Sequence, residues 1–260
     1  MKWVGGKGRL LEQFRSFLPS EYGCYFEPFL GGAALFFALA PAKASLSDVN
    51  EELIDCYTAV RDNVDSVIRA LKLHYYDEDY FYKVREQSPK ELPLPSRAAR
   101  TIFLNRTGYN GLYRVNSAGR FNVPFGRYTN PLICDEANLH ACSRALQEVR
   151  LTACDFGTST SQAKSGDFVY FDPPYAPISP TADFTSYSAD GFDWASQERL
   201  AAVFTELASR GVQVMLSNSD VPKIRKLYRG FSIDEVKAER RVNSNAAKRG
   251  RITEIVVRSY

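Results

Sequence analysis

Apolar residues in the first fifty positions are spaced as in alternating helices and strands. In order, this spacing predicts a helix at residues 8–18, a short buried strand at 25–29, a helix at 33–39 and a second strand at 44–48. The first strand turns at Pro28 and the pair Gly31-Gly32, and the second ends at a carboxylate, Asp48. Strand, glycine turn, helix, strand and acid, in this order, begin a nucleotide-binding α/β sheet.

The same alternation resumes near residue 149. The remaining predicted elements are strands at residues 149–154, 168–171 and 212–216, a helix at 198–209, and a C-terminal hairpin with strands near 231–241 and 253–258. The unbroken apolar run at 168–171 is typical of a central strand buried on both faces, and Asp172 follows it directly. We therefore predict an α/β fold, a Rossmann-like sheet with helices on both faces.

Residues 55–146 interrupt this alternation. The pattern there is helical at 54–73 and again at 97–104, and a segment rich in Gly, Asn and Arg follows at 105–130. We predict an inserted, mainly helical domain at 55–146, with the catalytic domain formed by residues 1–54 and 147–260. A single continuous domain with a long loop is the weaker alternative, because loops of this length are rare.

Charge is concentrated in two places, although the net charge of the 260 residues is only +3. Residues 101–130 hold four arginines, six aromatic residues and no acid. Residues 237–251 hold six basic residues and a single acid, Glu239. A solvated charged surface is the simpler interpretation, but the missing acids and the interleaved aromatics favour a bound polyanion.

Composition excludes several other classes of protein. Hydrophobic residues make up 45% of the chain and charged residues 24%, which is ordinary for a folded protein with a sizeable core. No apolar run approaches the length of a membrane span, and the N-terminus does not have the pattern of a signal peptide. With five scattered cysteines and two histidines, a zinc site is not expected. We expect a cytoplasmic protein without a metal.

The most specific motif is Asp172-Pro173-Pro174-Tyr175, placed directly after the central strand. The lone pair of an adenine amine is delocalised into the ring, so a site that methylates it must accept its hydrogens and return electron density to nitrogen. Asp172 supplies a carboxylate acceptor, and the prolines fix the turn while leaving the Pro173 carbonyl as a second acceptor. Tyr175 offers a ring on which a flipped-out base can stack. A proline-rich turn that only caps the strand is the alternative.

Two further motifs suggest a bound nucleotide-like ligand. The segment from Phe26 to Gly32 places glycines after the first strand, where a ligand can approach the backbone, and Asp48 lies where an acid usually binds ribose hydroxyls. A generic α/β core explains this pair equally well. In the segment at residues 2–7, a double-glycine turn could close over an amino-acid tail, with Lys7 taking its carboxylate.

The segment from Asn105 to Tyr128 combines arginines, asparagines, aromatics and glycines. Arginines bind phosphates or guanine edges, and asparagines bind adenine edges. An apolar or aromatic side chain such as Tyr109 or Leu112 can wedge between bases. The segment therefore indicates DNA recognition.

In this order, the motifs resemble the Dam-like DNA adenine-N6 methyltransferases of the alpha type, which act on GATC. The motifs are K-W-x-G-G-K from Lys2, F-E-P-F-x-G-G, D-x-N at Asp48, N-R-x-G-Y-N-G-L-x-R from Asn105, and D-P-P-Y. Thr107 stands where some relatives carry an aromatic residue. The resemblance implies a methyltransferase sheet, S-adenosylmethionine as methyl donor, and double-stranded DNA as partner.

The resemblance also implies roles for individual residues. Asp172, Pro173, Pro174 and Tyr175 would be catalytic. The cofactor would be bound by Trp3, Lys7, Glu27, Phe29, Gly31, Asp48, Asp155, Phe156 and Asp172. Tyr109, Asn110 and Leu112 would intrude into the duplex, Lys2 and Arg114 would read guanine, Pro124 and Tyr128 would face the A·T step, and Arg106 and Arg127 would anchor phosphates. Further DNA contacts are expected from Asn116, Asn243, Ser244, Asn245, Lys248 and Arg249.

Other activities remain open from the sequence alone. Cytosine-N4 methyltransferases use the same logic but typically have serine in place of Asp172, and glutamine methyltransferases tend to have asparagine there. RNA as substrate and a catalytically silent DNA-binding relative are further alternatives. A separately encoded restriction endonuclease is a candidate partner, and the sequence does not distinguish a restriction–modification enzyme from an orphan methylase bound to the nucleoid.

Overall fold

The computed structural model describes residues 3, 6–116, 118–177, 192–239 and 251–260. Seven strands form one sheet: β1 (Tyr25–Glu27), β2 (Ala44–Asp48), β3 (Val149–Ala153), β4 (Phe168–Phe171), β5 (Gln213–Ser219), β6 (Ser232–Glu239) and β7 (Arg251–Arg258). Their order is β3-β2-β1-β4-β5-β7-β6. β1 pairs in parallel with β2 and β4, β4 pairs in parallel with β5, and β7 is antiparallel to β5 and β6. The predicted α/β class and the C-terminal hairpin are confirmed.

The parallel order places the carboxyl ends of β1, β4 and β5 at one edge of the sheet. All four residues of β4 are buried, as its unbroken apolar run predicts. β5 is also buried over its last six residues, although these end in the polar run from Ser217 to Ser219. Buried polar groups need hydrogen-bonding partners, so this run marks a place where side chains do more than fill the core.

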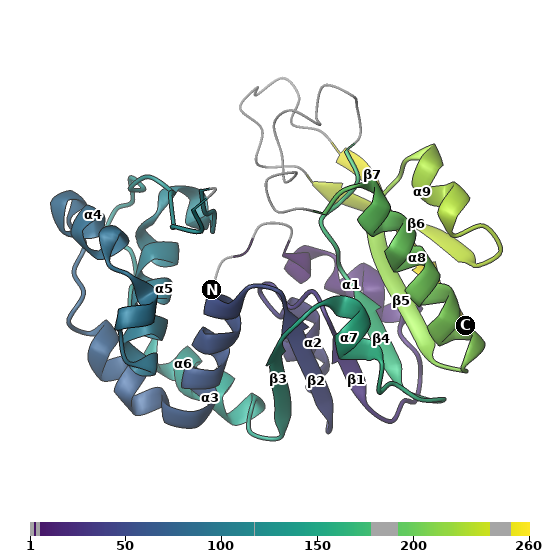
Figure 1. Ribbon diagram of the computed structural model, residues 1–260, viewed down its shortest axis with the longest axis horizontal. Coiled ribbons are helices and arrows are strands. Elements are labelled where there is room, and N and C mark those ends of the chain that lie inside the picture. Colours follow the sequence, from purple (N-terminus) through teal and green to yellow (C-terminus); the bar gives the residue numbers. More distant parts are fainter. Residues whose placement is uncertain (1–2, 4–5, 117, 178–191, 240–250) are drawn as a thin grey trace. The chain divides into compact units, whose positions relative to one another are not determined.

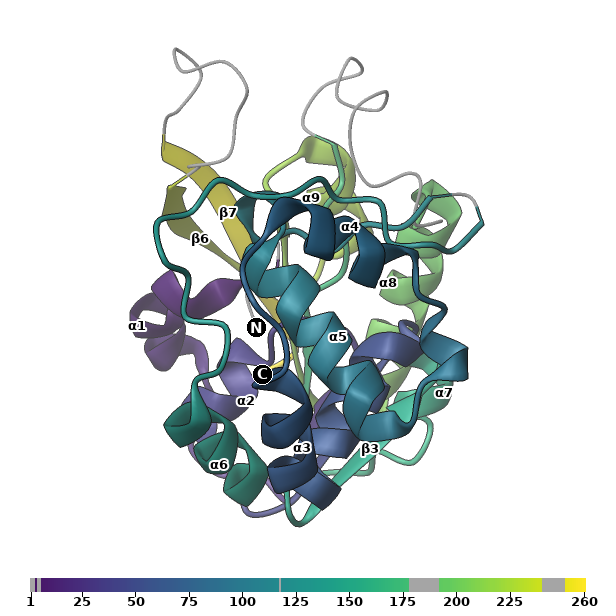
Figure 2. The same cartoon turned by 90° about the vertical axis from the view of Figure 1, so that its left-hand side faces the viewer.

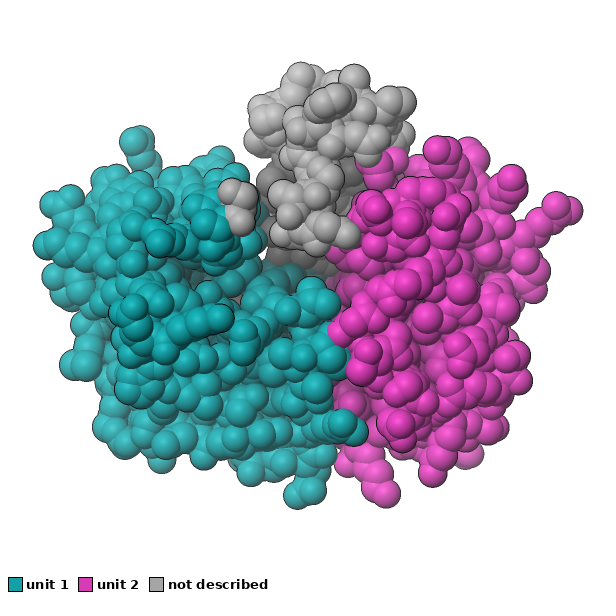
Figure 3. Space-filling model, in the orientation of Figure 1, with its two compact units in different colours: residues 1–6, 31–40, 47–154 teal, residues 7–30, 41–46, 155–260 magenta. Residues whose placement is uncertain are grey.

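The chain divides into two compact units, coloured separately in Figure 3. The first comprises residues 1–6, 31–40 and 47–154, and the second comprises residues 7–30, 41–46 and 155–260.

The second unit contains most of the sheet and the helices α1 (Leu11–Phe14), α7 (Phe156–Thr160), α8 (Trp194–Ser209) and α9 (Pro222–Leu227). Figure 1 shows α8 running alongside β5, and Leu200, Phe204 and Leu207 of α8 are buried in the core. The predicted helix at 198–209 begins four residues earlier because the Asp193 carboxylate accepts a hydrogen bond from the Ser196 amide. The predicted helix at 8–18 is a single α-turn between two 3₁₀ turns, Lys7–Arg9 and Arg15–Phe17.

The first unit is mainly helical, with α2 (Ala34–Leu39), α3 (Glu51–Leu71), α4 (Glu78–Glu86), α5 (Leu94–Thr107) and α6 (Glu136–Ala145). α3 packs against α5 and α6, and α4 lies against α5 (Figure 2). The predicted helices at 54–73 and 97–104 correspond to α3 and α5, whereas α4 and α6 were not predicted. The segment after α5 has a 3₁₀ turn at Tyr109–Gly111 and two isolated bridges, Gly108 with Phe125 and Val115 with Phe121.

None of the described helices combines the length and the apolar character that crossing a membrane requires.

Candidate functional site

Asp172 follows β4 directly, and its carboxylate is held by two side chains of the second unit. Nζ of Lys7 lies 2.8 Å from Oδ1 of Asp172, and the Ser217 hydroxyl donates to the same oxygen at 2.9 Å. The Asp172 side chain remains 20% exposed, whereas that of Lys7 is 7% exposed. The carboxylate is thus anchored from one side and still reachable by a ligand.

The residues after Asp172 are fixed by polar side chains from β5 and α8. The carbonyl of Pro174 accepts a hydrogen bond from Nε2 of Gln197 at 2.9 Å. Asn218 accepts from the Ala176 amide at 3.1 Å and donates to Oε1 of Gln197 at 3.1 Å. The Ser219 hydroxyl donates to the Ala176 carbonyl at 2.6 Å. Both ends of the turn are therefore tied to the sheet and to a helix, which keeps its geometry rigid.

Tyr175 is held by a partner that sequence reasoning missed. Its hydroxyl donates to Oε2 of Glu254, on β7, at 2.8 Å, and the Lys7 ammonium lies 4.4 Å from the centre of its ring. Burial of the hydroxyl, followed by the charges of Asp172 and Glu254, raises the pKa of Tyr175 well above its usual value. The side chain stays neutral, with a fixed ring orientation.

Three phenylalanine rings cluster around Phe29, which lies two residues after the end of β1. The rings of Phe29 and Phe156 are stacked with centroids 5.4 Å apart, and Phe171 and Phe192 pack edge-on against Phe29. Glu27, which ends β1, is 3% exposed and accepts a hydrogen bond from the Tyr25 hydroxyl at 2.9 Å. The second unit therefore contains three residues that were predicted to bind the cofactor, Glu27, Phe29 and Phe156.

Asp155 caps the short helix α7, where it accepts a hydrogen bond from the Gly157 amide at 2.9 Å. It also pairs with both terminal nitrogens of Arg199, whose guanidinium lies 3.9 Å from the centre of the Phe156 ring. The hydrogen bond from Arg199 lowers the pKa of Asp155. Arg199 was not predicted, and it orients the predicted pair of Asp155 and Phe156.

In the first unit, the glycine turn is built around Asp48 and Trp3. The Gly31 amide donates to Oδ2 of Asp48 at 3.1 Å, and the Asn50 amide donates to Oδ1 at 3.0 Å. Gly31 has a φ of +46°, and a Cβ there would lie 2.7 Å from Cδ1 of Trp3. The indole also stacks on Tyr113, with centroids 5.3 Å apart. Trp3 is therefore packed against the glycine turn by Tyr113, a residue that sequence reasoning did not single out.

Some of the predicted DNA-binding residues surround one hollow of the first unit. Its volume is about 360 Å³, and it is lined by Tyr109, Asn110, Phe125, Arg127 and Tyr128. Tyr109 is 52% exposed, which its predicted entry into a duplex requires. The segment after α5 thus presents aromatic, amide and guanidinium groups together.

Other predicted DNA contacts have different surroundings. Arg114 donates to the side chain and the carbonyl of Asn122 at 2.7 and 3.2 Å. Oδ1 of Asn116 accepts from the amides of Ala118 and Arg120, so this side chain holds its own turn. Lys2 and the residues Asn243, Ser244, Asn245, Lys248 and Arg249 lie outside the described residues.

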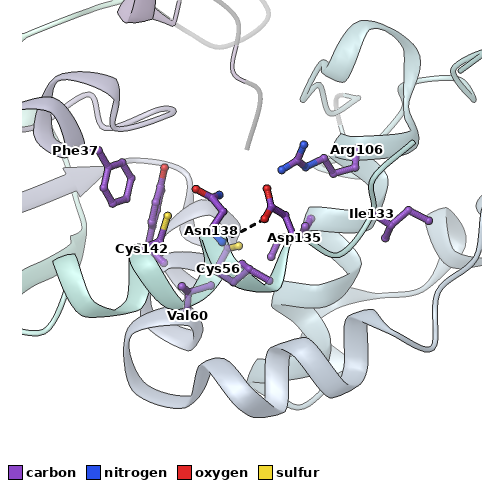
Figure 4. Close-up of a pocket in the computed structure, with 11 residues that line it drawn as sticks. Phe37, Cys56, Val60, Arg106, Ile133, Asp135, Asn138 and Cys142 are labelled. Atoms are coloured by element: carbon purple, nitrogen blue, oxygen red, sulfur yellow. Dashed lines mark hydrogen bonds between the residues drawn. The ribbon is translucent and has the colours of Figure 1, made fainter. Parts of the chain in front are cut away.

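Arg106 lines a separate small pocket between α3, α5 and α6, shown in Figure 4. Its volume is about 50 Å³, too small for a nucleoside cofactor, and Cys56, Cys142, Asp135 and Asn138 also line it. Burial raises the pKa of Cys56 to about 12, so this thiol is inert.

The chain is similar along its whole length to known DNA methyltransferases. The profile of the D12 class N6 adenine-specific DNA methyltransferases matches residues 3–242. The Type II methyltransferase M1.LlaDCHI of Lactococcus lactis subsp. cremoris is 43% identical, over 100% of this chain and 94% of the relative. The Type II methyltransferase M.MjaIII of Methanocaldococcus jannaschii is 41% identical over 100% and 98%. The DNA adenine methylase of Escherichia coli K12 is 35% identical over 98% and 93%. The chain therefore belongs to the D12 class of N6 adenine-specific DNA methyltransferases.

Proposed function

We propose that the protein methylates N6 of an adenine that is flipped out of duplex DNA, within the sequence GATC. The observation that carries this proposal is the anchoring of Asp172. Its partners in the described part of the chain, Lys7 and Ser217, both bind Oδ1, so Oδ2 is available to accept a hydrogen of the amine. The side chain of Asp172 is only 20% exposed, so a base that is still paired and stacked in a duplex cannot reach its carboxylate. The target base must therefore be flipped out of the helix.

Within the described residues, no donor bonds to the carbonyl of Pro173, whereas that of Pro174 is occupied by Gln197. The Pro173 carbonyl is therefore the proposed acceptor for the second hydrogen of the amine. Tyr175, held by Glu254, is the proposed stacking platform. Two acceptors on one NH₂ group raise the electron density on nitrogen and fix the direction of its lone pair.

S-adenosylmethionine is the methyl donor, and when bound it supplies a methyl group on a sulfonium sulfur, which keeps the electron pair as the methyl group leaves. The chain's own residues fit it. The carboxylate of Asp48 is aligned by the backbone amides of Gly31 and Asn50, and each oxygen of a carboxylate can accept more than one hydrogen bond, as a contact with ribose hydroxyls requires. We propose that Trp3, Gly31 and Asp48 of the first unit hold the cofactor.

In the second unit, Glu27, Phe29, Asp155 and Phe156 are the proposed cofactor contacts. The stacked phenylalanines offer an apolar surface for a purine ring. Lys7 is proposed to take the carboxylate of the cofactor while remaining near Asp172. An ammonium with three hydrogens can serve both partners.

Residues 55–146 are the proposed target-recognition domain. Tyr109, Asn110 and Leu112 would enter the duplex, and Arg114, with Lys2, would read guanine. Pro124 and Tyr128 would face the A·T step, and Arg106 and Arg127 would contact phosphates. The hollow lined by Tyr109, Asn110, Arg127 and Tyr128 supports a shared role for these four side chains.

Two of the relatives are named Type II methyltransferases and one a DNA adenine methylase. A cognate restriction endonuclease, encoded separately, is therefore a proposed partner. Because the substrate is duplex DNA, we propose that the protein works in the cytoplasm, on the nucleoid.

The test is methyl transfer from tritiated S-adenosylmethionine to two duplexes that differ only in GATC or GTAC at the centre. The two duplexes have the same base composition, adenine included, so any difference in labelling reports recognition of the base order. We expect label in the GATC duplex alone. Equal labelling of both would contradict GATC recognition, and label in neither would contradict the proposed activity on this site.

A further inference from the structure

A chain of buried hydroxyl groups lies behind Asp172. The Ser217 hydroxyl donates to Oδ1 of Asp172 at 2.9 Å, and the Tyr170 hydroxyl lies 2.9 Å from Oγ of Ser217. Ser217 is fully buried and Tyr170 is 1% exposed. Tyr170 belongs to the central strand β4 and Ser217 to β5, its parallel neighbour, so the sheet itself fixes both hydroxyl groups.

The direction of the hydrogen bonds follows from the inventory of hydrogens. A serine hydroxyl has one hydrogen, and an ionised carboxylate can only accept. Ser217 therefore gives its hydrogen to Asp172 and must accept from Tyr170. Burial raises the pKa of Tyr170 well above its usual value, so this phenol keeps the hydrogen that it donates.

The carboxylate of an aspartate otherwise turns with a broad, roughly two-fold preference about its last bond. With Lys7 and Ser217 both bound to Oδ1, that rotation is restricted and the two oxygens become different. Oδ1 is occupied by Lys7 and Ser217, whereas Oδ2 has no partner in the described part of the chain.

We propose that Ser217, oriented by Tyr170, is a positioning residue for methyl transfer, which fixes Oδ1 of Asp172 so that Oδ2 is the atom that accepts the hydrogen of the adenine amine. Neither residue touches the substrate or the cofactor in this proposal. Their effect is on the step in which the amine is aligned, and therefore on the rate of transfer rather than on binding.

The test uses single-turnover methylation of unmethylated bacterial DNA by the full chain, so that it does not depend on the GATC assignment. The variants are Ser217→Ala, Tyr170→Phe and the double variant. Tyr228→Phe is the matched control, since Tyr228 is also a fully buried tyrosine and its hydroxyl has no hydrogen-bond partner in the described structure. Affinities for S-adenosylmethionine and for DNA are measured by titration, and folding by thermal unfolding.

We expect Ser217→Ala to lower the transfer rate about 10- to 100-fold, as for a lost hydrogen bond to a charged group, with both affinities unchanged. Tyr170→Phe should slow transfer in the wild-type background and have no further effect in Ser217→Ala, because the two act through one chain of hydrogen bonds. Tyr228→Phe should transfer at the wild-type rate.

Several results would overturn the inference. These are an unchanged rate in Ser217→Ala, multiplicative effects of the two substitutions, or a rate loss in Tyr228→Phe equal to that in Tyr170→Phe. Should Ser217→Ala fail to fold, Tyr170→Phe alone decides, and an unchanged rate in that variant overturns the proposal. A wild-type protein that labels no DNA would contradict the proposed activity itself, which is a separate outcome.

Discussion

Nζ of Lys7 lies 2.8 Å from Oδ1 of Asp172 and 4.4 Å from the centre of the Tyr175 ring. The sequence suggested a different partner for this ammonium, the carboxylate of the cofactor. Lys7 is largely buried beside the carboxylate, so the contact is screened by solvent less than a surface ion pair is, and removal of the ammonium would leave the Asp172 charge without this partner.

We predict that Lys7→Met lowers methyl transfer at saturating cofactor by about tenfold, which corresponds to roughly 1.4 kcal/mol of lost transition-state stabilisation. The variant should also bind S-adenosylmethionine more weakly. The measurement is kcat and KM for the cofactor in steady state. An unchanged kcat with a raised KM would mean that Lys7 serves the cofactor alone and has no part in holding Asp172.

Substitution of Arg114 tests the proposal that its side chain reads a guanine of the target sequence. Its guanidinium is held by Asn122 through Nε and Nη2, and the proposed contact with guanine would use the remaining N–H groups of Nη1 and Nη2. We predict that Arg114→Ala reduces discrimination at one guanine by about 1–3 kcal/mol. The measurement is the ratio of kcat/KM on GATC to that on a duplex with this guanine replaced.

Arg120→Ala is the matched control, since it removes an exposed arginine of the same segment. It should weaken binding to both duplexes alike and leave the ratio unchanged. If Arg114→Ala and Arg120→Ala alter the ratio equally, Arg114 is not a base reader.

Gly31 tests the packing of the glycine turn in the first unit. An added Cβ would meet the Trp3 indole at 2.7 Å, in a backbone conformation that residues other than glycine rarely adopt. We predict that Gly31→Ala destabilises the fold by about 1 kcal/mol or more and weakens cofactor binding. Gly8→Ala, where a Cβ meets no atom within 4 Å, should do neither. Urea unfolding and cofactor titration of both variants decide this, and equal effects would disprove the prediction.

The lowered pKa of His74 leads us to predict that the stability of the fold depends on pH. Burial lowers the pKa of His74 to about 4 in the folded protein, against about 6.5 for an unfolded chain. The unfolded chain therefore takes up the proton first. The stability associated with neutral His74 is fully present above pH 6.5 and is lost as the pH falls toward 4.

The ring of His74 stacks on Phe103, so His74→Phe keeps the packing while removing the titration. We expect the free energy of unfolding to fall less between pH 7.5 and 5 in His74→Phe than in the wild type. The same fall in His74→Phe and the wild type would contradict the assignment.

The parts of the fold that the sequence predicted are those with local patterns. The central strand at 168–171 has the predicted bounds, because a continuous apolar run bounded by turns identifies a buried strand. The strand at 44–48, in which Ala44 and Leu46 alternate with polar residues, also has the predicted bounds. α4 was missed because it buries only Phe81 and Val84 and is otherwise polar. Its start depends on the Asp77 cap, which is a weak signal when read alone.

In the candidate site, too, residues in local motifs were predicted, whereas contacts between distant segments were not. Asp172 was identified because its chemistry follows from a motif at a strand end. The contact of Tyr175 with Glu254 joins residues 79 positions apart, and it depends on β7 pairing beside β5, which no local pattern reveals. The polar run from Ser217 to Ser219 was visible after an apolar strand, but its link to Asp172 required the parallel pairing of β4 and β5.

The most direct test of the account is the product formed by the wild type and by Asp172→Ala on one GATC duplex. After incubation with S-adenosylmethionine, the DNA is digested to nucleosides and analysed by mass spectrometry, and duplex binding is measured in parallel. We expect N6-methyldeoxyadenosine from the wild type and none from Asp172→Ala, which should still bind the duplex. Methylation of cytosine at N4, or near-normal turnover by Asp172→Ala, would contradict the account.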